Sequence, residues 1–133
     1  MTESTLVPEG LHYTKDHEWV RVEGGAAVVG ITDYAQKALG DITYVDLPPA
    51  GKEVKQFHEL AAVESAKAAV DVFAPVSGTV SEVNTLLDGA PETVNTAPYD
   101  AGWLCKLTGV SSGELENLLT AGQYTDFLRQ EKH

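Results

Sequence analysis

The sequence predicts a mainly β domain, a sandwich or a barrel, and three observations lead to this fold class. Short runs of alternating or β-branched residues recur along the chain, turn residues separate many of them, and 43% of the 133 residues are apolar. A chain of this length corresponds to one domain and can bury a core without disulfides or metals. We therefore expect residues 1–133 to form a single domain.

Seven segments have the composition and alternation of β-strands. In residues 42–47, a period of two places Ile42 and Tyr44 on one face of a strand and Val45 and Leu47 on the other. The other segments are residues 18–23, 26–31, 60–65, 69–74, 79–83 and 103–108. Glycine and proline pairs between many of these runs supply the turns.

One short helix is expected between the second and third strand-like runs. Thr32 or Asp33 can cap its first turn, because both side chains accept hydrogen bonds from free helix amides. The pattern continues to Leu39, and Gly40 then ends the helix.

The C-terminal segment, about residues 111–131, is predicted to be helical and to pack on the β domain. Ser111 with Glu114 fits a capping box, and Thr120 with Gln123 fits another. Apolar residues follow each box at helical spacing, so we expect these helices to lie over a sheet face or to cover a sheet edge.

Charge and composition exclude several classes of partner. The formal net charge is −11, which disfavours nucleic acids and anionic membrane surfaces, since both bind clustered cations. No apolar run approaches the roughly 20 residues of a spanning helix. Residues 1–10 lack the apolar stretch of a signal peptide, and the one cysteine, Cys105, cannot form an internal disulfide. A cytoplasmic protein is therefore expected.

Residue patterns for catalysis or metal binding are scarce. None of the four histidines has a metal-binding spacing, and no nucleophile elbow or phosphate-binding loop occurs. His17 is interpreted as a partly buried, hydrogen-bonded histidine, and Cys105 as a small buried hydrophobic residue. The sequence therefore predicts no metal site and no enzyme active site.

Lys67 stands out because it lies among alanines between two strand-like runs. From Ala68 to Cys105 the chain has five acidic residues and neither lysine nor arginine. The residues around Lys67 leave two interpretations open. It is either an ordinary solvated lysine or an unobstructed amine suited to covalent attachment of a prosthetic group.

Several stretches of the chain recur together in a family-like order and spacing: residues 13–19, 30–36, 39–41, 64–68, 74–78, 98–99 and 102–103, with Asn95. On these residues the sequence resembles the swinging-arm carriers, the lipoyl and biotinyl domains, and specifically the glycine cleavage H-protein family. Biotinyl domains usually flank their lysine with methionines, and lipoyl domains of 2-oxoacid dehydrogenases usually have Asp-Lys-Ala. This chain has Ser65-Ala66-Lys67-Ala68. The similarity runs from about Tyr13 to Leu128.

The resemblance implies a barrel-sandwich hybrid of the lipoyl/biotinyl type, also called a hammerhead, with Lys67 at an exposed hairpin tip. It implies that Lys67 carries lipoate through an amide. The chain would then be a non-catalytic carrier in glycine catabolism and one-carbon metabolism. Its partners would be glycine decarboxylase (P protein), which supplies an aminomethyl group, aminomethyltransferase (T protein), which removes it, and dihydrolipoyl dehydrogenase (L protein), which reoxidises the dithiol.

The resemblance also implies which residues the lipoate-attaching enzymes recognise. These enzymes require a glutamate three residues before the lysine and glycines sixteen before and eleven after it. Glu64, Gly51 and Gly78 occupy those positions.

Two further acidic residues match family positions. Glu18 and Asp71 are expected to contact the arm, in a cleft or near the hairpin tip. The chain also departs from the family at Phe57, where a turn glycine is common, at Val70, where a small polar residue is common, and at Tyr34, where some relatives have histidine.

Alternative functions remain open at this point. A lipoyl relay protein that donates lipoate to other acceptors would share every motif above, and a biotinyl-type carrier would use the same kind of lysine. A non-covalent β scaffold would carry no adduct. An enzyme acting alone has no supporting residue pattern.

Overall fold

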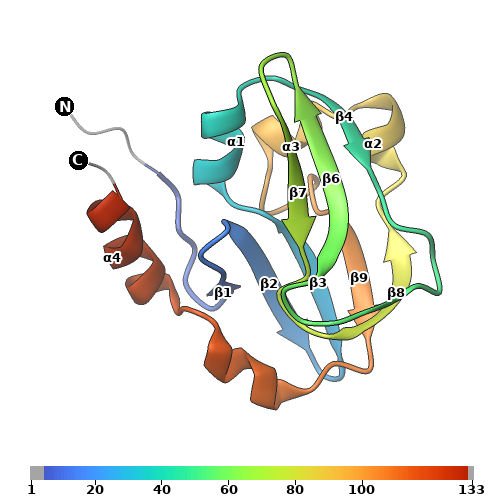
Figure 1. Ribbon diagram of the computed structural model, residues 1–133, viewed down its shortest axis with the longest axis vertical. Coiled ribbons are helices and arrows are strands. Elements are labelled where there is room, and N and C mark those ends of the chain that lie inside the picture. The colour runs from blue at the N-terminus through green and yellow to red at the C-terminus, as the bar shows by residue number, and fades with distance from the viewer. Residues whose placement is uncertain (1–4, 132–133) are drawn as a thin grey trace.

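The computed structural model describes residues 5–131 and contains two antiparallel sheets packed face to face (Figure 1). The larger sheet has the order β1-β2-β3-β9-β8-β5, and the smaller has the order β4-β6-β7. The strands are β1 (His12–Tyr13), β2 (Glu18–Glu23), β3 (Ala26–Ile31), β4 (Ile42–Asp46), β5 (Glu53–Val54), β6 (Glu59–Ser65), β7 (Ala69–Phe73), β8 (Gly78–Val83) and β9 (Cys105–Thr108). The helices are α1 (Asp33–Leu39), α2 (Leu86–Gly89), α3 (Thr93–Thr96), η1 (Ser112–Asn117) and α4 (Ala121–Glu131).

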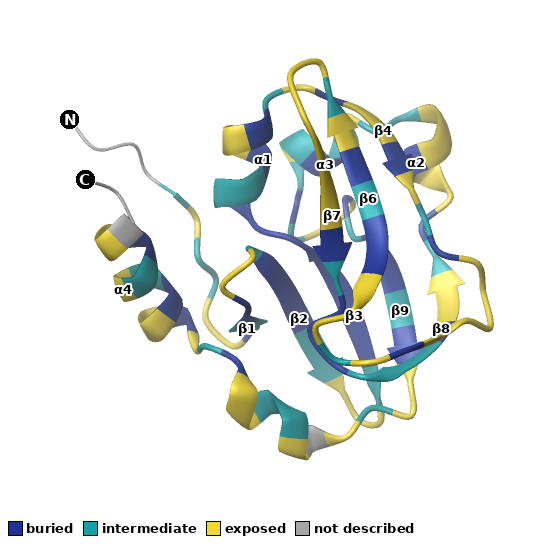
Figure 2. Cartoon of the chain, in the orientation of Figure 1, coloured by how far each residue is buried: buried dark blue, intermediate teal, exposed yellow. Residues whose placement is uncertain are grey.

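The main hydrophobic core lies between the two sheets. Val29 and Leu107 from the large sheet belong to the same buried cluster as Val45 and Val63 from the small one. Figure 2 shows that the interior between the sheets is buried, whereas the tip of the β6–β7 hairpin is exposed. The expected mainly β architecture with short helices is confirmed, and all seven predicted strand segments form strands. The very short elements β1, β5, α2 and α3 were not predicted.

One strand prediction was wrong in its side-chain alternation. Ile42 and Val45 are both buried, whereas Tyr44 is exposed. The register between β4 and β6 shifts between Ile42 and Tyr44, as in a β-bulge. A bulge inserts one extra residue and reverses the alternation beyond it, so a period of two could not hold across residues 42–45.

The predicted α1 helix is confirmed at both ends. The Thr32 hydroxyl accepts a hydrogen bond from the amide of Ala35, which caps the first turn. At the other end Gly40 has φ +80° and ψ −158°, a conformation open essentially to glycine alone.

Of the two capping boxes predicted in the C-terminal segment, one is formed and the other is not. The Thr120–Gln123 box is formed, with side chain-to-amide bonds in both directions, and α4 follows it. The Ser111–Glu114 box is absent and a 3₁₀ helix, η1, stands there instead. The Glu114 carboxylate accepts from the amide and the hydroxyl of Ser77, so a tertiary contact replaces the local cap.

The outer face of β1, β2 and β3 is covered by α4. Tyr13, Trp19 and Val28 from the strands form a second buried cluster with Tyr124 and Leu128 of α4. No helix within residues 5–131 is long and apolar enough to cross a membrane.

Candidate functional site

Lys67 lies in the tight turn between β6 and β7, and its side chain is exposed. The Ser65 amide donates to the carbonyl of Ala68 at 2.8 Å. The Ser65 hydroxyl oxygen lies 3.3 Å from the amide nitrogen of Lys67 and 3.2 Å from that of Ala68. The serine side chain thus holds a turn that has no Asn-Gly or Asp-Gly pair, and it presents Lys67 outward.

The hairpin tip stands next to the end of α1. A Cβ atom built on Gly40 would lie 3.5 Å from Cε and 4.0 Å from Nζ of Lys67. The Gly40 carbonyl accepts from Nδ2 of Asn95, and the amide of Ile42 donates to Oδ1 of the same side chain, each at 2.9 Å. Asn95, on α3, therefore holds the main chain on which the lysine stem rests.

A cleft of about 570 Å³ lies between α1 and β7. Its walls combine apolar side chains with acidic, basic and aromatic ones. The lining residues are Lys15, Asp16, His17, Tyr34, Ala35, Ala38, Leu39, Val70, Asp71 and Phe73. Leu39 adjoins Gly40 and Val70 is three residues from Lys67, so the cleft begins beside the hairpin tip.

The two acidic residues that were expected to contact the arm lie in different surroundings. Asp71 lines the cleft and is exposed. Glu18 does not line it and is only 1% exposed. Its carboxylate accepts from the hydroxyl of Thr14 and from the amide of Phe73, the latter at 2.9 Å. Glu18 thus joins the segment before β2 to the wall-forming strand β7.

Burial changes the ionisation of Glu18. Removal from water raises the pKa of this carboxyl to about 7, although the hydrogen bonds from Thr14 and Phe73 act in the opposite direction. The group therefore changes charge near neutral pH.

His17 forms part of the cleft wall in an uncommon backbone conformation, with φ 74°. Its ring centroid lies 4.5 Å from that of Tyr34, which also lines the cleft. Nδ1 of His17 is 2.8 Å from the hydroxyl of Tyr124 on α4. The interpretation of His17 as a half-buried, hydrogen-bonded histidine is confirmed.

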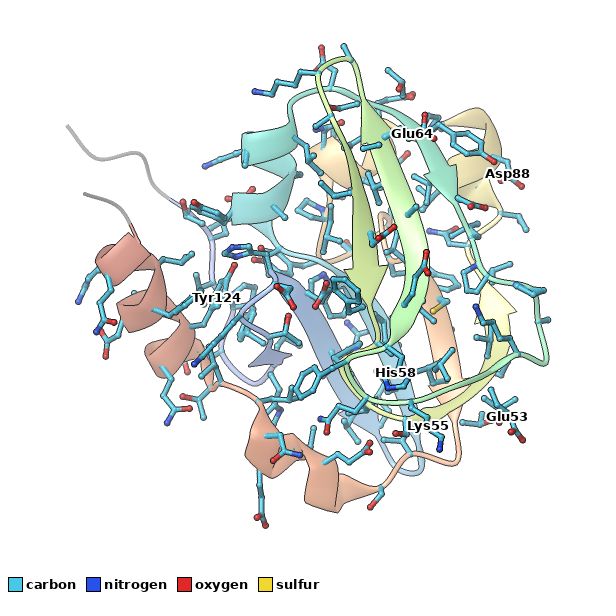
Figure 3. All side chains as sticks on the ribbon, in the orientation of Figure 1. Glu53, Lys55, His58, Glu64, Asp88 and Tyr124 are labelled. Atoms are coloured by element: carbon cyan, nitrogen blue, oxygen red, sulfur yellow. The ribbon has the colours of Figure 1, made fainter. Side chains whose placement is uncertain are left out.

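The three expected recognition residues occupy opposite ends of the molecule. Glu64 is exposed on β6, paired with Tyr44 on one side and with Ala69 on the other. Figure 3 shows Glu64 at the hairpin end and Glu53 at the far end. Gly78 pairs with Val54, the neighbour of Glu53, so it belongs to the far end.

Local geometry explains both of these glycines. Gly51 has φ +92°, and its amide donates to the carbonyl of Val80 at 2.7 Å. A Cβ atom on Gly78 would stand 2.7 Å from the carbonyl oxygen of Thr108, which is too close for any side chain. Backbone conformation and close packing therefore require glycine at these positions.

Cys105 is fully buried, and burial raises the pKa of its thiol to about 12, so the thiol stays protonated and unreactive. Over residues 5–131, no three histidine, cysteine, aspartate or glutamate side chains come together as a metal site would need.

Gly40, Asn95 and Tyr124 are among the residues around the site to which sequence reasoning gave no role there. Gly40 was interpreted as a helix stop, and Gly40 and Asn95 as part of the family resemblance, but neither was linked to Lys67. Their contacts with Lys67 and His17 join segments far apart in the chain, so no local signal could reveal them.

Comparison with known proteins agrees with this geometry. The family model described as Glycine cleavage H-protein matches residues 11–131. The glycine cleavage system H protein of Leptospira biflexa is 48% identical over 124 residues, which are 93% of this chain and 95% of that protein. That of Xanthobacter autotrophicus is 56% identical over 118 residues, covering 89% of this chain and 94% of the relative.

A solved structure shows the same fold. The crystal structure of a glycine cleavage system H protein from Mycobacterium marinum superposes with a TM-score of 0.80 and 38% sequence identity. The match covers 96% of this chain and all of that one. On the agreement of fold, length and sequence, this chain belongs to the glycine cleavage H-protein family.

Proposed function

We propose that this family member is the carrier of a glycine cleavage system and that it bears lipoate on Nζ of Lys67. The observation that carries the proposal is the placement of Lys67, exposed at a hairpin tip and adjoining a cleft. Attachment forms an amide between Nζ and the carboxyl carbon of an activated lipoyl group. The amine loses a proton, and the activating group leaves.

The cleft beside Lys67 fits such an arm. Its volume of about 570 Å³ lies within the range of small-molecule sites, and Ala38, Leu39 and Val70 offer apolar surface to a hydrocarbon chain. When bound, lipoate would supply a dithiolane that takes up an aminomethyl group and later returns to the disulfide. The carboxylates of Asp16 and Asp71 would face the ammonium group of that cargo.

Glu18 takes a supporting role in this proposal. Its oxygens already accept from Thr14 and Phe73, so it would hold the cleft wall rather than touch the arm. Of Glu18 and Asp71, only Asp71 would contact the cargo directly. A walled cleft that excludes water would slow hydrolysis of the cargo between enzymes.

Of the three residues proposed for recognition by lipoate-attaching enzymes, one would act by direct contact and two would act through the fold. Glu64 lies three residues from Lys67 and is exposed, so it can touch such an enzyme. Gly51 and Gly78 would act through the fold, because they adjoin β5 and the start of β8 at the far end.

The proposed protein partners are glycine decarboxylase, aminomethyltransferase and dihydrolipoyl dehydrogenase. A carrier must bind each one reversibly, and electrostatic contact gives fast, weak association without a large apolar patch. The net charge of −11 suits docking on basic surfaces. The chain itself then needs an accessible amine and a cleft, not catalytic groups.

Mass spectrometry tests the attachment site. The chain produced in lipoate-replete cells should gain one lipoyl group, and peptide mapping should place it on Lys67. Lys67→Arg should lose both the adduct and carrier activity with the three purified partners. Lys106→Arg, at a lysine that pairs with Glu82, is the matched control and should retain both.

Three results would contradict this proposal. They are a lipoyl group on another lysine, a biotin adduct that binds avidin, and lipoate transfer to other acceptors without glycine-dependent turnover.

A further inference from the structure

Tyr124 links α4 to the cleft although it does not line it. Its side chain is fully buried, and Figure 3 shows it on the side of α4 that faces the strands. The hydroxyl lies 2.8 Å from Nδ1 of His17 and 2.8 Å from the hydroxyl of Thr32. Burial raises the pKa of the phenol well above its ordinary value, so Tyr124 acts as a neutral hydroxyl.

These contacts close a triangle across three separate segments. The Thr32 amide donates to the carbonyl of His17 at 3.0 Å, and the Thr32 hydroxyl caps α1. His17 is thus held at its carbonyl by the start of α1 and at its ring by α4. This double hold accounts for a left-handed backbone at a residue other than glycine.

The orientation of His17 decides the shape of the cleft. Its ring packs on Tyr34, and both side chains line the cleft together with Val70 and Asp71. None of the cleft-lining residues belongs to α4, so α4 reaches the cleft through His17. The Tyr124 hydroxyl bonds to the His17 ring, and the ring of Phe127 lies 6.0 Å from it between centroids.

We propose that Tyr124 is a positioning residue for the arm cleft: its hydroxyl fixes the His17 imidazole, and α4 thereby sets how well the cleft shields the arm and its cargo. This inference rests on the proposed function. It goes beyond that function by assigning the C-terminal helix a part in cargo protection.

The chain offers a matched control for the test. Tyr13 stacks on Tyr124 with ring centroids 4.7 Å apart, and both side chains are fully buried. The Tyr13 hydroxyl donates instead to the carbonyl of Pro8, away from His17. Tyr124→Phe and Tyr13→Phe each remove one buried hydroxyl from the same stack, and only the first removes the bond to His17.

Two measurements on the whole chain test the positioning role of Tyr124. The first is the imidazole ¹⁵N spectrum of unmodified protein, which reports hydrogen bonding at Nδ1 of His17. The second is the rate at which the lipoylated chain, loaded by glycine decarboxylase and then separated from it, releases ammonia. Tyr124→Phe should change the His17 signals and raise the release rate about two- to tenfold, which is the range expected for loss of the hydrogen bond to His17. Tyr13→Phe should change neither.

A double variant tests whether Tyr124 acts through His17. His17→Asn removes the ring and keeps a residue that tolerates positive φ. In that background Tyr124→Phe should add no further increase in release. Equal effects of the two Tyr→Phe variants, or an undiminished effect of Tyr124→Phe beside His17→Asn, would overturn the proposal.

The two readouts also keep this inference distinct from the proposed function. A chain that never accepts lipoate would refute the proposed function. The imidazole spectrum of the unmodified chain would still show whether Tyr124 orients His17, and unchanged His17 signals in Tyr124→Phe would refute the inference alone.

Discussion

The stem of Lys67 rests on the main chain of Gly40, with Cε 3.5 Å from the place where a Cβ atom on Gly40 would be. Gly40 is also the residue that ends α1, and α1 forms one wall of the cleft. One glycine thus ends the wall-forming helix and leaves room for the lysine beside it. The Asn95 side chain holds the main chain at this point by hydrogen bonds to the Gly40 carbonyl and the Ile42 amide.

Substitution of Gly40 by alanine should affect both stability and modification. Because φ +80° with ψ −158° is open essentially to glycine alone, Gly40→Ala should lower the free energy of unfolding by about 1–3 kcal/mol. The added methyl group would also come into contact with the Lys67 stem, 3.5 Å from Cε, and should restrict its rotation and slow lipoylation of the folded protein. Denaturant unfolding and a timed lipoylation assay measure the two effects.

Gly109→Ala is the control for this variant. Gly109 also has positive φ, +71°, but nothing lies within 4 Å of its Cβ position. It should lose stability and keep the normal rate of lipoylation per folded molecule. Equal lipoylation rates in both variants would show that Gly40 does not guide the lysine.

Glu64→Gln should slow lipoylation severalfold without changing the free energy of unfolding. The side chain is exposed on β6 near the lysine, and the substitution removes its charge while keeping its size. Glu53→Gln removes an exposed charge at the far end (Figure 3) and should be lipoylated normally. Equal slowing in the two variants would mean that overall charge, not position, is recognised.

Gly78→Ala should reduce lipoylation only by unfolding the protein. The methyl group would collide with the Thr108 carbonyl at 2.7 Å and approach Cβ of Leu107 at 3.2 Å. We expect a loss of about 1–3 kcal/mol, as for other overpacked sites. Lipoylation rates normalised to the folded fraction, measured by circular dichroism, should equal those of the unsubstituted chain; a residual defect would indicate direct recognition of Gly78.

The elements predicted correctly from sequence are those whose signals are local. Thr32 and Gly40 bracket α1, and Thr120 with Gln123 starts α4, because caps depend on residues within one helical turn. The Ser111–Glu114 box had the same local pattern and failed. Ser77 offers Glu114 two donors, and a contact between distant segments is invisible to local rules.

In the candidate site, too, the part that depends on neighbouring residues was predicted and the part that depends on distant segments was not. Lys67 could be singled out by its surroundings in the chain, whereas the cleft could not, because its walls come from residues 15–17, 34–39 and 70–73. Glu18 was singled out in the sequence by its match to a family position. Only the fold shows that its carboxylate is buried and bonded to Thr14 and to the amide of Phe73, because both contacts depend on how the segments pack.

At Phe57, substitution by glycine should leave the protein more stable than substitution by alanine, the reverse of the usual order. Its φ of 68° is left-handed, a region that favours glycine. Phe57→Gly and Phe57→Ala both remove the ring, but only glycine relieves the backbone. The glycine variant should therefore be more stable than the alanine variant by about 1 kcal/mol, the usual left-handed penalty. Thermal unfolding compares the two, and a more stable alanine variant would contradict this account of the bend.

Glu18 should make the protein lose stability as the pH rises towards neutrality. Its pKa is about 7 in the folded chain against 4.5 in the unfolded chain, so folding favours the protonated form. The associated stability is fully present below pH 4.5 and is lost as the pH rises through 7. The pKa difference corresponds to about 3 kcal/mol.

Glu18→Gln removes this titration while keeping a side chain that can still bind Thr14 and Phe73. Denaturant unfolding at intervals between pH 4.5 and 8 should therefore give a shallower decline for Glu18→Gln than for the unsubstituted chain. Glu53→Gln, at an exposed carboxylate, should follow the unsubstituted chain. Identical pH profiles for all three proteins would show that Glu18 is charged throughout this range, and a buried carboxylate held by only two donors would then need a further partner.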